Sequence, residues 1–315
     1  MKVVNVGSLN LDRTYRLQDF VRPEETVRAL AYEQHSGGKG LNQSIALARG
    51  GAETWHVGMV GPEGSQLVNA LEDAGVNVAH VGVAETATGH AVIQVNDCGQ
   101  NNIIVFGGAN ESVAEKHVCD VLAQCEPGDF VLAQNETTGT GIAIERAHEL
   151  GLTVVLNPSP MDERVFSLRL DLVDIFMVNW PEAVSLARNC ANNGSAFEKE
   201  ELSLEEVVDL LSDAYPSAAF VLTLGERGSV LFDAEGIKAR CSAFKVKAID
   251  TTGAGDTFCG FYLAELIRGK EGLDALRWAS AASAIAVCRH GASASIPSRL
   301  EVEQFISLHN EEDMQ

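Results

Sequence analysis

Short apolar runs of strand length alternate along the chain with segments whose apolar residues recur every three or four positions. The apolar runs lie at about residues 2–7, 53–61, 76–83, 129–134, 152–157, 172–179 and 218–224. The segments between them with helical spacing lie at about 64–74, 114–124, 204–214 and 273–288, with one more helix ending near Gly151. This alternation predicts a mostly parallel sheet covered by helices, followed by an antiparallel hairpin at 229–244.

Two segments interrupt the alternation. Residues 14–36 mix charged and apolar residues without a helical period, and Pro23 lies among them. Runs at 91–95 and 102–106 flank a turn rich in Asn, Asp and Gly, which predicts a hairpin. We expect strands within about 12–36 and 88–108 to form a small sheet outside the main core. Such a sheet can cover a ligand as a lid or pair with a second subunit.

Two predicted helices open on glycine turns. In the first, at 37–51, Leu41, Ile45 and Ala48 mark one face, and a glycine pair ends the helix. A P-loop is excluded because Lys39 is followed by Gly40 and Leu41, where that motif requires Ser or Thr. The glycines instead let a small polyhydroxy ligand lie against the backbone, with hydrogen-bonding side chains from Lys39 and Asn42.

The second glycine turn, Asp250 to Thr257, opens a helix predicted from about Ala254 to Arg268, with Gly269 as its C-cap. Free amides and the positive end of the helix dipole make this turn suitable for an anion such as a phosphoryl group. Taken alone, Asp256 is most simply a helix-stabilising carboxylate of the first turn. Beside three small residues, it also suits a base that removes a proton from an attacking hydroxyl.

Polar residues also follow several predicted strands. They are Asn10 and Asp12 in a turn at 7–12, Asn135 and Glu136, Asn157, and Asn179 with Glu182. Each by itself is typical of a cap or an Asx turn. Because parallel strands bring their carboxyl ends to one edge, together they outline a ligand-binding crevice. The polar segment 189–203 reads as a surface loop without chemistry, and the acidic tail after Pro297 is expected to fray.

The composition and charge of the chain limit the kinds of partner that it can bind. The 315 residues are 46% hydrophobic and 21% charged, which is typical of a globular α/β protein. With 23 Lys and Arg against 44 Asp and Glu, the net charge of −21 argues against nucleic acid and anionic membrane as partners. It does not exclude a nucleotide, since backbone amides can build a phosphate site.

The cysteines and the apolar runs bear on location. Seven scattered cysteines without a CxxC pair indicate a reducing cytoplasm and argue against a zinc site. The first apolar run meets Gly7 before a signal-peptide core can form, and no later run is long enough to span a membrane. A cytoplasmic protein is therefore expected.

The motifs resemble those of the ribokinase (PfkB carbohydrate kinase) family over nearly the full length. GGKGLNQ at 37–43 and DTTGAGDTF at 250–258 match its two signatures, and GSLNLD, GGAN, LNPSP, NWPEA, LTLGERG and HGASASIP match further pieces in order. The resemblance implies a three-layer α/β/α sandwich with a mostly parallel central sheet and a small β-sheet lid. It also implies a single kinase domain over residues 1–315.

The resemblance implies ATP-dependent phosphorylation of the terminal primary hydroxyl of a pentose, foremost D-ribose to D-ribose 5-phosphate. Asp256 matches the catalytic base, and the amides of Gly253, Ala254 and Gly255 match the anion hole. The positions that match sugar-binding residues are Asn10, Asp12, Gly38, Lys39, Asn42 and Glu136.

The resemblance also assigns the cofactors. Positions for ATP are Asn179, Glu182, Thr223, Gly225, Gly228 and Ser280, with Mg²⁺ near Asn179 and Glu182. Positions for an activating K⁺, bound mostly through carbonyls, are Asp250, Thr252, Ala286, Arg289, Gly291 and Ser295. A potassium ion behind the anion hole would raise the field on developing negative charge. A homodimer through the lid sheet is expected by the same resemblance.

Some alternatives stay open. Leu41 stands where ribokinases usually have alanine, and Asn135 stands before Glu136 where an apolar residue is common. Other substrates are therefore considered: deoxyribose, a fructose-type furanose, or a nucleoside such as pseudouridine. A sugar- or nucleotide-binding regulator without activity is a further alternative, disfavoured by the intact Asp256. A dinucleotide-dependent dehydrogenase is disfavoured because no GxGxxG follows the first strand.

Overall fold

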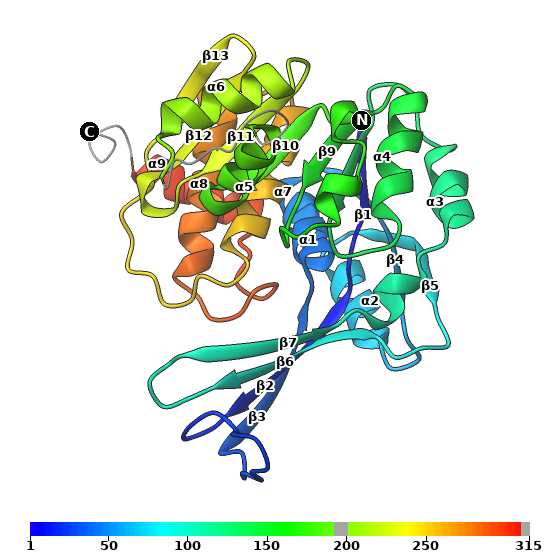
Figure 1. Ribbon diagram of the computed structural model, residues 1–315, viewed down its shortest axis with the longest axis vertical. Helices are drawn as coiled ribbons and strands as arrows, with labels where there is room; N and C mark the ends of the chain where they lie inside the picture. The colour runs from blue at the N-terminus through cyan, green and yellow to red at the C-terminus, as the bar shows by residue number, and fades with distance from the viewer. Residues whose placement is uncertain (192–200, 310–315) are drawn as a thin grey trace.

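One twisted sheet runs through the body of the molecule, in the order β13-β12-β11-β10-β9-β8-β1-β4-β5 (Figure 1). The structure is a computed structural model that describes residues 1–191 and 201–309. The strands are β1 (Lys2–Val6), β4 (Glu53–Val60), β5 (Asn77–Val83), β8 (Phe130–Gln134), β9 (Thr153–Asn157), β10 (Ile175–Asn179), β11 (Ala219–Thr223), β12 (Ser229–Asp233) and β13 (Gly236–Cys241). All neighbours pair in parallel except β11 with β12 and β12 with β13. The predicted parallel sheet and its terminal hairpin are confirmed.

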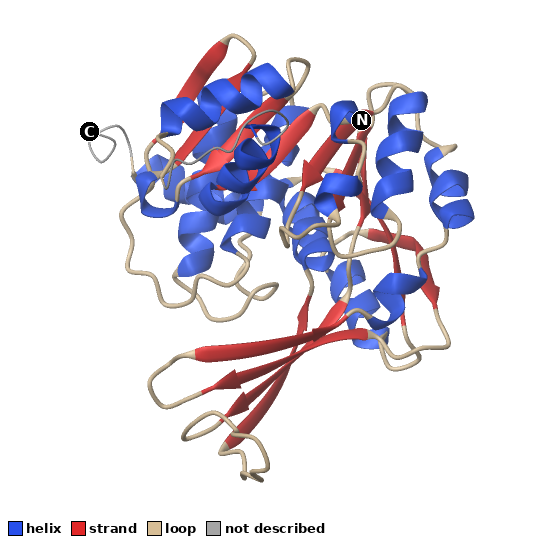
Figure 2. Ribbon diagram, in the orientation of Figure 1, coloured by secondary structure: helices blue, strands red, loops and turns tan. Residues whose placement is uncertain are grey.

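Helices cover both faces of this sheet, so that the body has three layers (Figure 2). One face carries α1 (Lys39–Gly50), α2 (Ser65–Asp73), α7 (Ala254–Ile267), α8 (Gly272–Val287) and α9 (Arg299–Leu308). The other carries α3 (Glu115–Leu122), α4 (Thr140–Glu149), α5 (Trp180–Ala191) and α6 (Leu204–Ala214). Successive strand residues point to opposite faces, so Val3 packs into the first core while Val4 and Val6 pack into the second.

A second sheet extends away from the body (Figure 1). It contains β2 (Asn10–Arg16), β3 (Ala31–Gly37), β6 (Gly89–Val95) and β7 (Asn101–Phe106) in the order β3-β2-β6-β7. We call it the lid sheet. The small sheet predicted from 12–36 and 88–108 is confirmed, but the predicted turn at 7–12 is wrong in part. Asn10 and Asp12 lie on β2 because Asn10 pairs with both Gly37 and Gly89, which extends the strand to that point.

Two predictions about the polar segments also change. Residues 189–191 belong to the last turn of α5, and Ser203 caps α6 through a capping box with Glu206, so only 192–200 of the predicted loop lie outside the described residues. After Pro297, where a frayed tail was expected, α9 begins with a capping box between Ser298 and Glu301. The Ser-x-x-Glu spacing was the signal for this helix. Residues 310–315 are not described.

Helix α7 is buried on every side over residues 256–265. It packs against both α1 and α8. Its contact with α1 is close, since a Cβ on Gly260 would lie 2.4 Å from the Cβ of Ala46. The two glycine-opened helices are therefore held side by side. Among residues 1–191 and 201–309, no helix is long and apolar enough to cross a membrane.

Candidate active site

The two glycine turns meet at the entrance of α1 and α7. Gly38 and Gly253 precede these helices with φ values of 96° and 74°, a region that glycine adopts without strain. The first hydrogen bond of the α7 ladder runs from Thr257 N to Gly253 O at 2.8 Å, so the amides of Ala254, Gly255 and Asp256 remain outside the ladder. A Cβ on Gly255 would meet no atom within 4 Å. The turn therefore leaves open space beside Gly255, while the amide of Ala254 donates to Thr251 O at 3.3 Å.

The carboxylate of Asp256 points to α1. It is 8% exposed, and its Oδ2 accepts a hydrogen bond from Asn42 Nδ2 while its Oδ1 accepts one from Gln43 Nε2, both at 2.9 Å. These two amides fix the orientation of the carboxylate. An ordinary helix-stabilising aspartate is exposed and serves its own helix, whereas Asp256 is buried and joined to a neighbouring helix.

The residues predicted to bind sugar converge beside Asp256. Glu136 accepts hydrogen bonds from the Ser8 hydroxyl and, at 3.1 Å, from the backbone N of Lys39. Asp12 lies against Gly37, where a Cβ would come within 2.0 Å of the Asp12 carboxylate. Asn10 Oδ1 accepts from Asn110 Nδ2 at 2.8 Å, which ties β2 to the GGAN segment. Residues far apart in sequence thus form one polar wall under the lid sheet.

The charges in this wall influence one another. Burial and the carboxylates of Glu136 and Asp256 together raise the pKa of Asp12 to about 6, against the opposing effect of His35. Burial also raises the pKa of Glu136, although Ser8 and Lys39 oppose the rise. Burial lowers the pKa of Lys39, but Asp256, Glu136 and Glu182 outweigh it and the net shift is upward. Lys39 therefore lies as an ammonium ion among carboxylates.

Two cavities adjoin at the Gly255 turn. The smaller, about 250 Å³, has Lys39, Asp256 and the small-residue turn in its wall. The larger, about 640 Å³, has a largely apolar wall that includes Phe244. Both are lined by Thr223, Thr251, Gly255 and Phe258. The predicted nucleotide positions divide between them: Asn179, Glu182 and Thr223 line the smaller cavity, and Thr223, Gly225, Gly228 and Ser280 line the larger.

Asn179 and Glu182 also have a structural role. Asn179 Oδ1 accepts from the backbone N of Glu182 at 2.9 Å, and Glu182 Oε2 accepts from the backbone N of Asn179 at 3.0 Å. This reciprocal pair caps the N-terminus of α5. It also aims a buried carboxylate at the smaller cavity, which suits a hydrated Mg²⁺ because that ion prefers oxygen donors and keeps several waters.

The predicted potassium positions come from two segments that lie together behind the α7 turn. Asp250 Oδ1 accepts from the amide and hydroxyl of Thr252, and Asp250 Oδ2 accepts from the amide of Gly291 at 2.9 Å. Ile249 N donates to Val287 O at 2.7 Å, which holds the two segments in register. Such a loop pair offers carbonyl oxygens, the donors that hard cations favour. Within the described residues, no group of three or more His, Cys, Asp or Glu side chains forms a metal cluster.

Several site residues were not singled out from the sequence. Gln43 is fully buried and donates to Asp256 and to Asn157 Oδ1, while its Oε1 accepts from Gln134 Nε2 at 2.8 Å. Its place in the GGKGLNQ motif, directly after Asn42, was the available signal. Phe244, Lys245 and Val246 in the wall of the larger cavity had no sequence signal, because they follow β13 in an irregular segment. Leu41, which stands where alanine is usual, is fully buried in the core.

Comparison with known proteins assigns this geometry to a family. The model of the pfkB family of carbohydrate kinases matches residues 1–299. The chain belongs to the pfkB family. Among curated pfkB relatives, the ribokinase of Staphylococcus aureus is 37% identical over 314 residues, covering 96% of this chain and 99% of that protein.

Solved structures agree with this assignment. The chain is similar to the ribokinase of Cryptococcus neoformans var. grubii in complex with ADP, with a TM-score of 0.83, 29% identity, and coverage of 97% of this chain and 99% of that one. It is also similar to the ribokinase of Arabidopsis thaliana complexed with ribose and ATP, with a TM-score of 0.82, 28% identity, and coverage of 96% and 98%. The ribokinase-like α/β fold and the kinase class predicted from the motifs are confirmed.

Proposed function

We propose that this pfkB kinase transfers the γ-phosphoryl group of ATP to the terminal primary hydroxyl of D-ribose, giving D-ribose 5-phosphate. The observation that carries the proposal is the position of Asp256, which lines the smaller cavity next to Gly255, a residue that lines both cavities. The relatives named ribokinase, and the relative bound to ribose and ATP, support ribose as the acceptor.

The proposed reaction uses the groups at the junction. The sugar lies against Asn10, Asp12 and Glu136, with its terminal hydroxyl directed to Asp256. Asp256 removes the hydroxyl proton as the oxygen attacks the γ-phosphorus. The amides of Gly253, Ala254 and Gly255 stabilise the negative charge that develops on the transferred group.

The nucleotide is proposed to occupy the larger cavity, between Thr223, Gly225, Gly228 and Ser280. Its phosphates extend across the Gly255 turn toward Lys39, whose ammonium offsets negative charge. Asn179 and Glu182 would hold a Mg²⁺ ion, which would neutralise phosphate charge. The backbone carbonyls of the segments at 250–252 and 286–295 would hold a K⁺ ion, which would strengthen the field of the anion hole from behind.

We further propose one kinase domain over residues 1–315 that works in the cytoplasm as a homodimer through the lid sheet. Strand β7 supports the dimer, because Ile103, Ile104, Val105 and Phe106 are between 47% and 64% exposed. An apolar strand this exposed favours contact with a second copy. Size-exclusion chromatography with light scattering measures the assembly.

The test of function is an ATP-consumption assay across ribose, deoxyribose, fructose, tagatose and nucleosides, with and without potassium. We expect ribose to give the highest kcat/KM, since that ratio measures differential binding of the transition state. We also expect potassium to raise the rate. A nucleoside that exceeds ribose in kcat/KM would overturn the choice of substrate, and no turnover with any acceptor would overturn the activity.

The pKa of Asp12 gives a prediction for pH. Only the ionised carboxylate accepts hydrogen bonds from sugar hydroxyls with both oxygens. Because the pKa of Asp12 is raised to about 6, its ionised fraction grows as pH increases through 6. We therefore expect kcat/KM for ribose, measured at saturating ATP between pH 5 and 8, to rise with an inflection near 6. Asp12→Asn should abolish that inflection; an unchanged profile in the variant would assign it to another group.

A further inference from the structure

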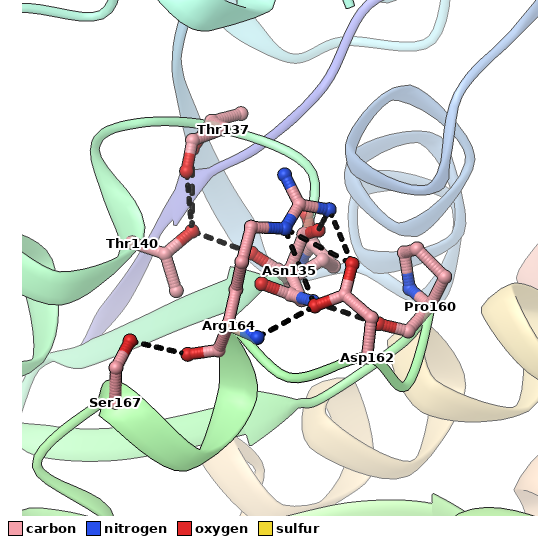
Figure 3. Close-up of polar contacts among 8 residues, drawn as sticks. Asn135, Thr137, Thr140, Pro160, Asp162, Arg164 and Ser167 are labelled. Atoms are coloured by element: carbon pink, nitrogen blue, oxygen red, sulfur yellow. Dashed lines mark hydrogen bonds and ion pairs between the residues drawn. The ribbon is translucent and has the colours of Figure 1, made fainter. Parts of the chain in front are cut away.

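The residue before Glu136, Asn135, is bound by the connection that follows β9. Asn135 is 5% exposed, and its backbone N donates to Ser159 O at 3.1 Å. Its side-chain Nδ2 donates to Pro160 O at 2.7 Å and to Asp162 Oδ1 at 2.9 Å (Figure 3). An apolar residue at this position would make only the backbone contact.

Arg164 completes the arrangement. Its Nε and Nη2 donate to the Asp162 carboxylate at 3.0 Å and 2.7 Å, and its Nη2 also reaches Asn135 O at 3.4 Å. Figure 3 shows the guanidinium of Arg164 over Asp162, with Asn135 beside them. Hydrogen bonds from Arg164 and Asn135 lower the pKa of Asp162 to about 2, so its carboxylate stays ionised at any practical assay pH. We call Asn135, Asp162 and Arg164 the clasp.

The other side of the Glu136 segment is fixed by a different group. The Thr140 hydroxyl donates to Gln134 O and, at 3.1 Å, to Thr137 O (Figure 3). Thr138 N donates to Asn110 O at 3.3 Å. Glu136 thus follows a residue held by the clasp and precedes a turn held by Thr140, and its carboxylate reaches Ser8 and the amide of Lys39.

The geometry points to the clasp as a positioning device that sets Glu136 for the sugar and shapes substrate affinity. The inference rests on the proposed function, because it takes Glu136 as a sugar-binding residue. Without the clasp, only the hydrogen bond from Asn135 N to Ser159 O joins this segment to the connection after β9. Glu136 must then be ordered when the sugar binds. That ordering costs conformational entropy at the binding step.

The clasp also joins two walls of the site. Ser159, which accepts from Asn135 N, lines the smaller cavity, and Asn157, at the end of β9 just before this connection, accepts from Gln43. The acidic wall around Glu136 and the wall facing the phosphates are thereby held at a fixed separation. The clasp residues themselves do not line either cavity, so they act through Glu136 and Ser159.

The experiment compares Arg164→Ala and Asp162→Ala with a matched control. The control is Arg169→Ala, since Arg169 makes the same two-bond contact with Asp171 at the same spacing, at 2.8 Å and 2.6 Å, on the same exposed connection. Within the described residues, the Arg169 side chain donates hydrogen bonds only to Asp171. We expect both clasp variants to raise KM for ribose about three- to tenfold, with less than about a twofold change in KM for ATP. Their Tm should stay within a few degrees of the wild type. The control should match the wild type.

A double variant of the clasp and the variant Glu136→Gln distinguish a failure of this inference from a failure of the proposed function. In the double variant Arg164→Ala with Asn135→Ala, the rise in KM for ribose should be smaller than the product of the rises in the two single variants. The reason is that both residues bind the same carboxylate, Asp162, so either substitution disrupts the same set of contacts. Glu136→Gln should raise KM for ribose by more than any clasp variant. Unchanged KM in the clasp variants, or an equal rise in Arg169→Ala, would overturn the clasp while Glu136→Gln still supports the sugar site. Unchanged KM in Glu136→Gln would overturn the sugar site and the clasp together.

Discussion

Asp256→Asn is expected to lower kcat by about two to four orders of magnitude while leaving the Kd values for ribose and ATP nearly unchanged. The amide cannot take up the proton of the attacking hydroxyl. It keeps the shape of the carboxylate, however, so substrate contacts that do not involve proton transfer remain. Steady-state kinetics with ribose measure the fall in kcat, and calorimetry measures the Kd values for ribose and ATP separately.

The surroundings of Asp256 allow this substitution to fold. An amide at position 256 would turn one NH₂ group toward a donor, either Asn42 or Gln43. Gln43 is held by Gln134 and Asn157, but Asn42 Oδ1 has no hydrogen-bond partner within the described residues. Rotating the Asn42 amide by half a turn therefore converts it from donor to acceptor. We expect Tm to stay within a few degrees of the wild type, about the effect of one hydrogen bond.

The matched control is Asp274→Asn. Asp274 is the third residue of α8, as Asp256 is the third residue of α7, but it is exposed and lines neither cavity. If Asp256 acted only as a first-turn helix carboxylate, the two variants would behave alike. Equal activity of both variants would refute the role of Asp256 as base.

Arg299→Leu is expected to lower the free energy of unfolding by about 3 kcal/mol, since removing one partner of a buried ion pair leaves an uncompensated charge. Glu265, on α7, is fully buried and forms an ion pair with Arg299. Arg299 also donates to Gly50 O at 2.8 Å and lies 4.2 Å from the ring centroid of Trp278. One guanidinium thus joins α1, α7, α8 and α9, and leucine retains only the contact with Trp278. Equilibrium unfolding in urea measures the change.

Two further variants show whether burial of the Glu265 charge causes the loss of stability in Arg299→Leu. Arg146→Leu breaks an ion pair of 2.7 Å with Glu149 whose side chains are 34% and 62% exposed, and should cost less than about 1 kcal/mol. Glu265→Leu combined with Arg299→Leu should recover most of the stability, because no charge is left buried. A loss in Arg299→Leu no larger than in Arg146→Leu would contradict the explanation.

The accuracy of the sequence predictions followed the strength of the local signals. Strands of the main sheet carry continuous apolar runs because both faces are covered, so nearly all were placed within a residue or two. Helix α5 had no predicted counterpart, because Asn179, which caps its first turn, was interpreted as a strand-end crevice residue. Its reciprocal bonds with Glu182 show that the same two residues cap a helix and line a cavity. When one residue has two roles, the sequence pattern does not show both of them.

The sequence by itself determined the layered fold and the two glycine turns, because these depend on periodicity and on local backbone requirements. The kinase family and the residue types of the site followed from the resemblance of its motifs. Only the tertiary structure decided which partners each group has. Asn42 and Gln43 lie more than 200 positions from Asp256, and the clasp reaches Asn135 from a connection about 25 residues away. Such contacts arise from the packing of α1 against α7 and of neighbouring strand ends, which no local pattern encodes. From the residues around it alone, Asp256 could be either a helix-stabilising carboxylate or a base. Its buried position between α1 and α7 makes it the candidate base.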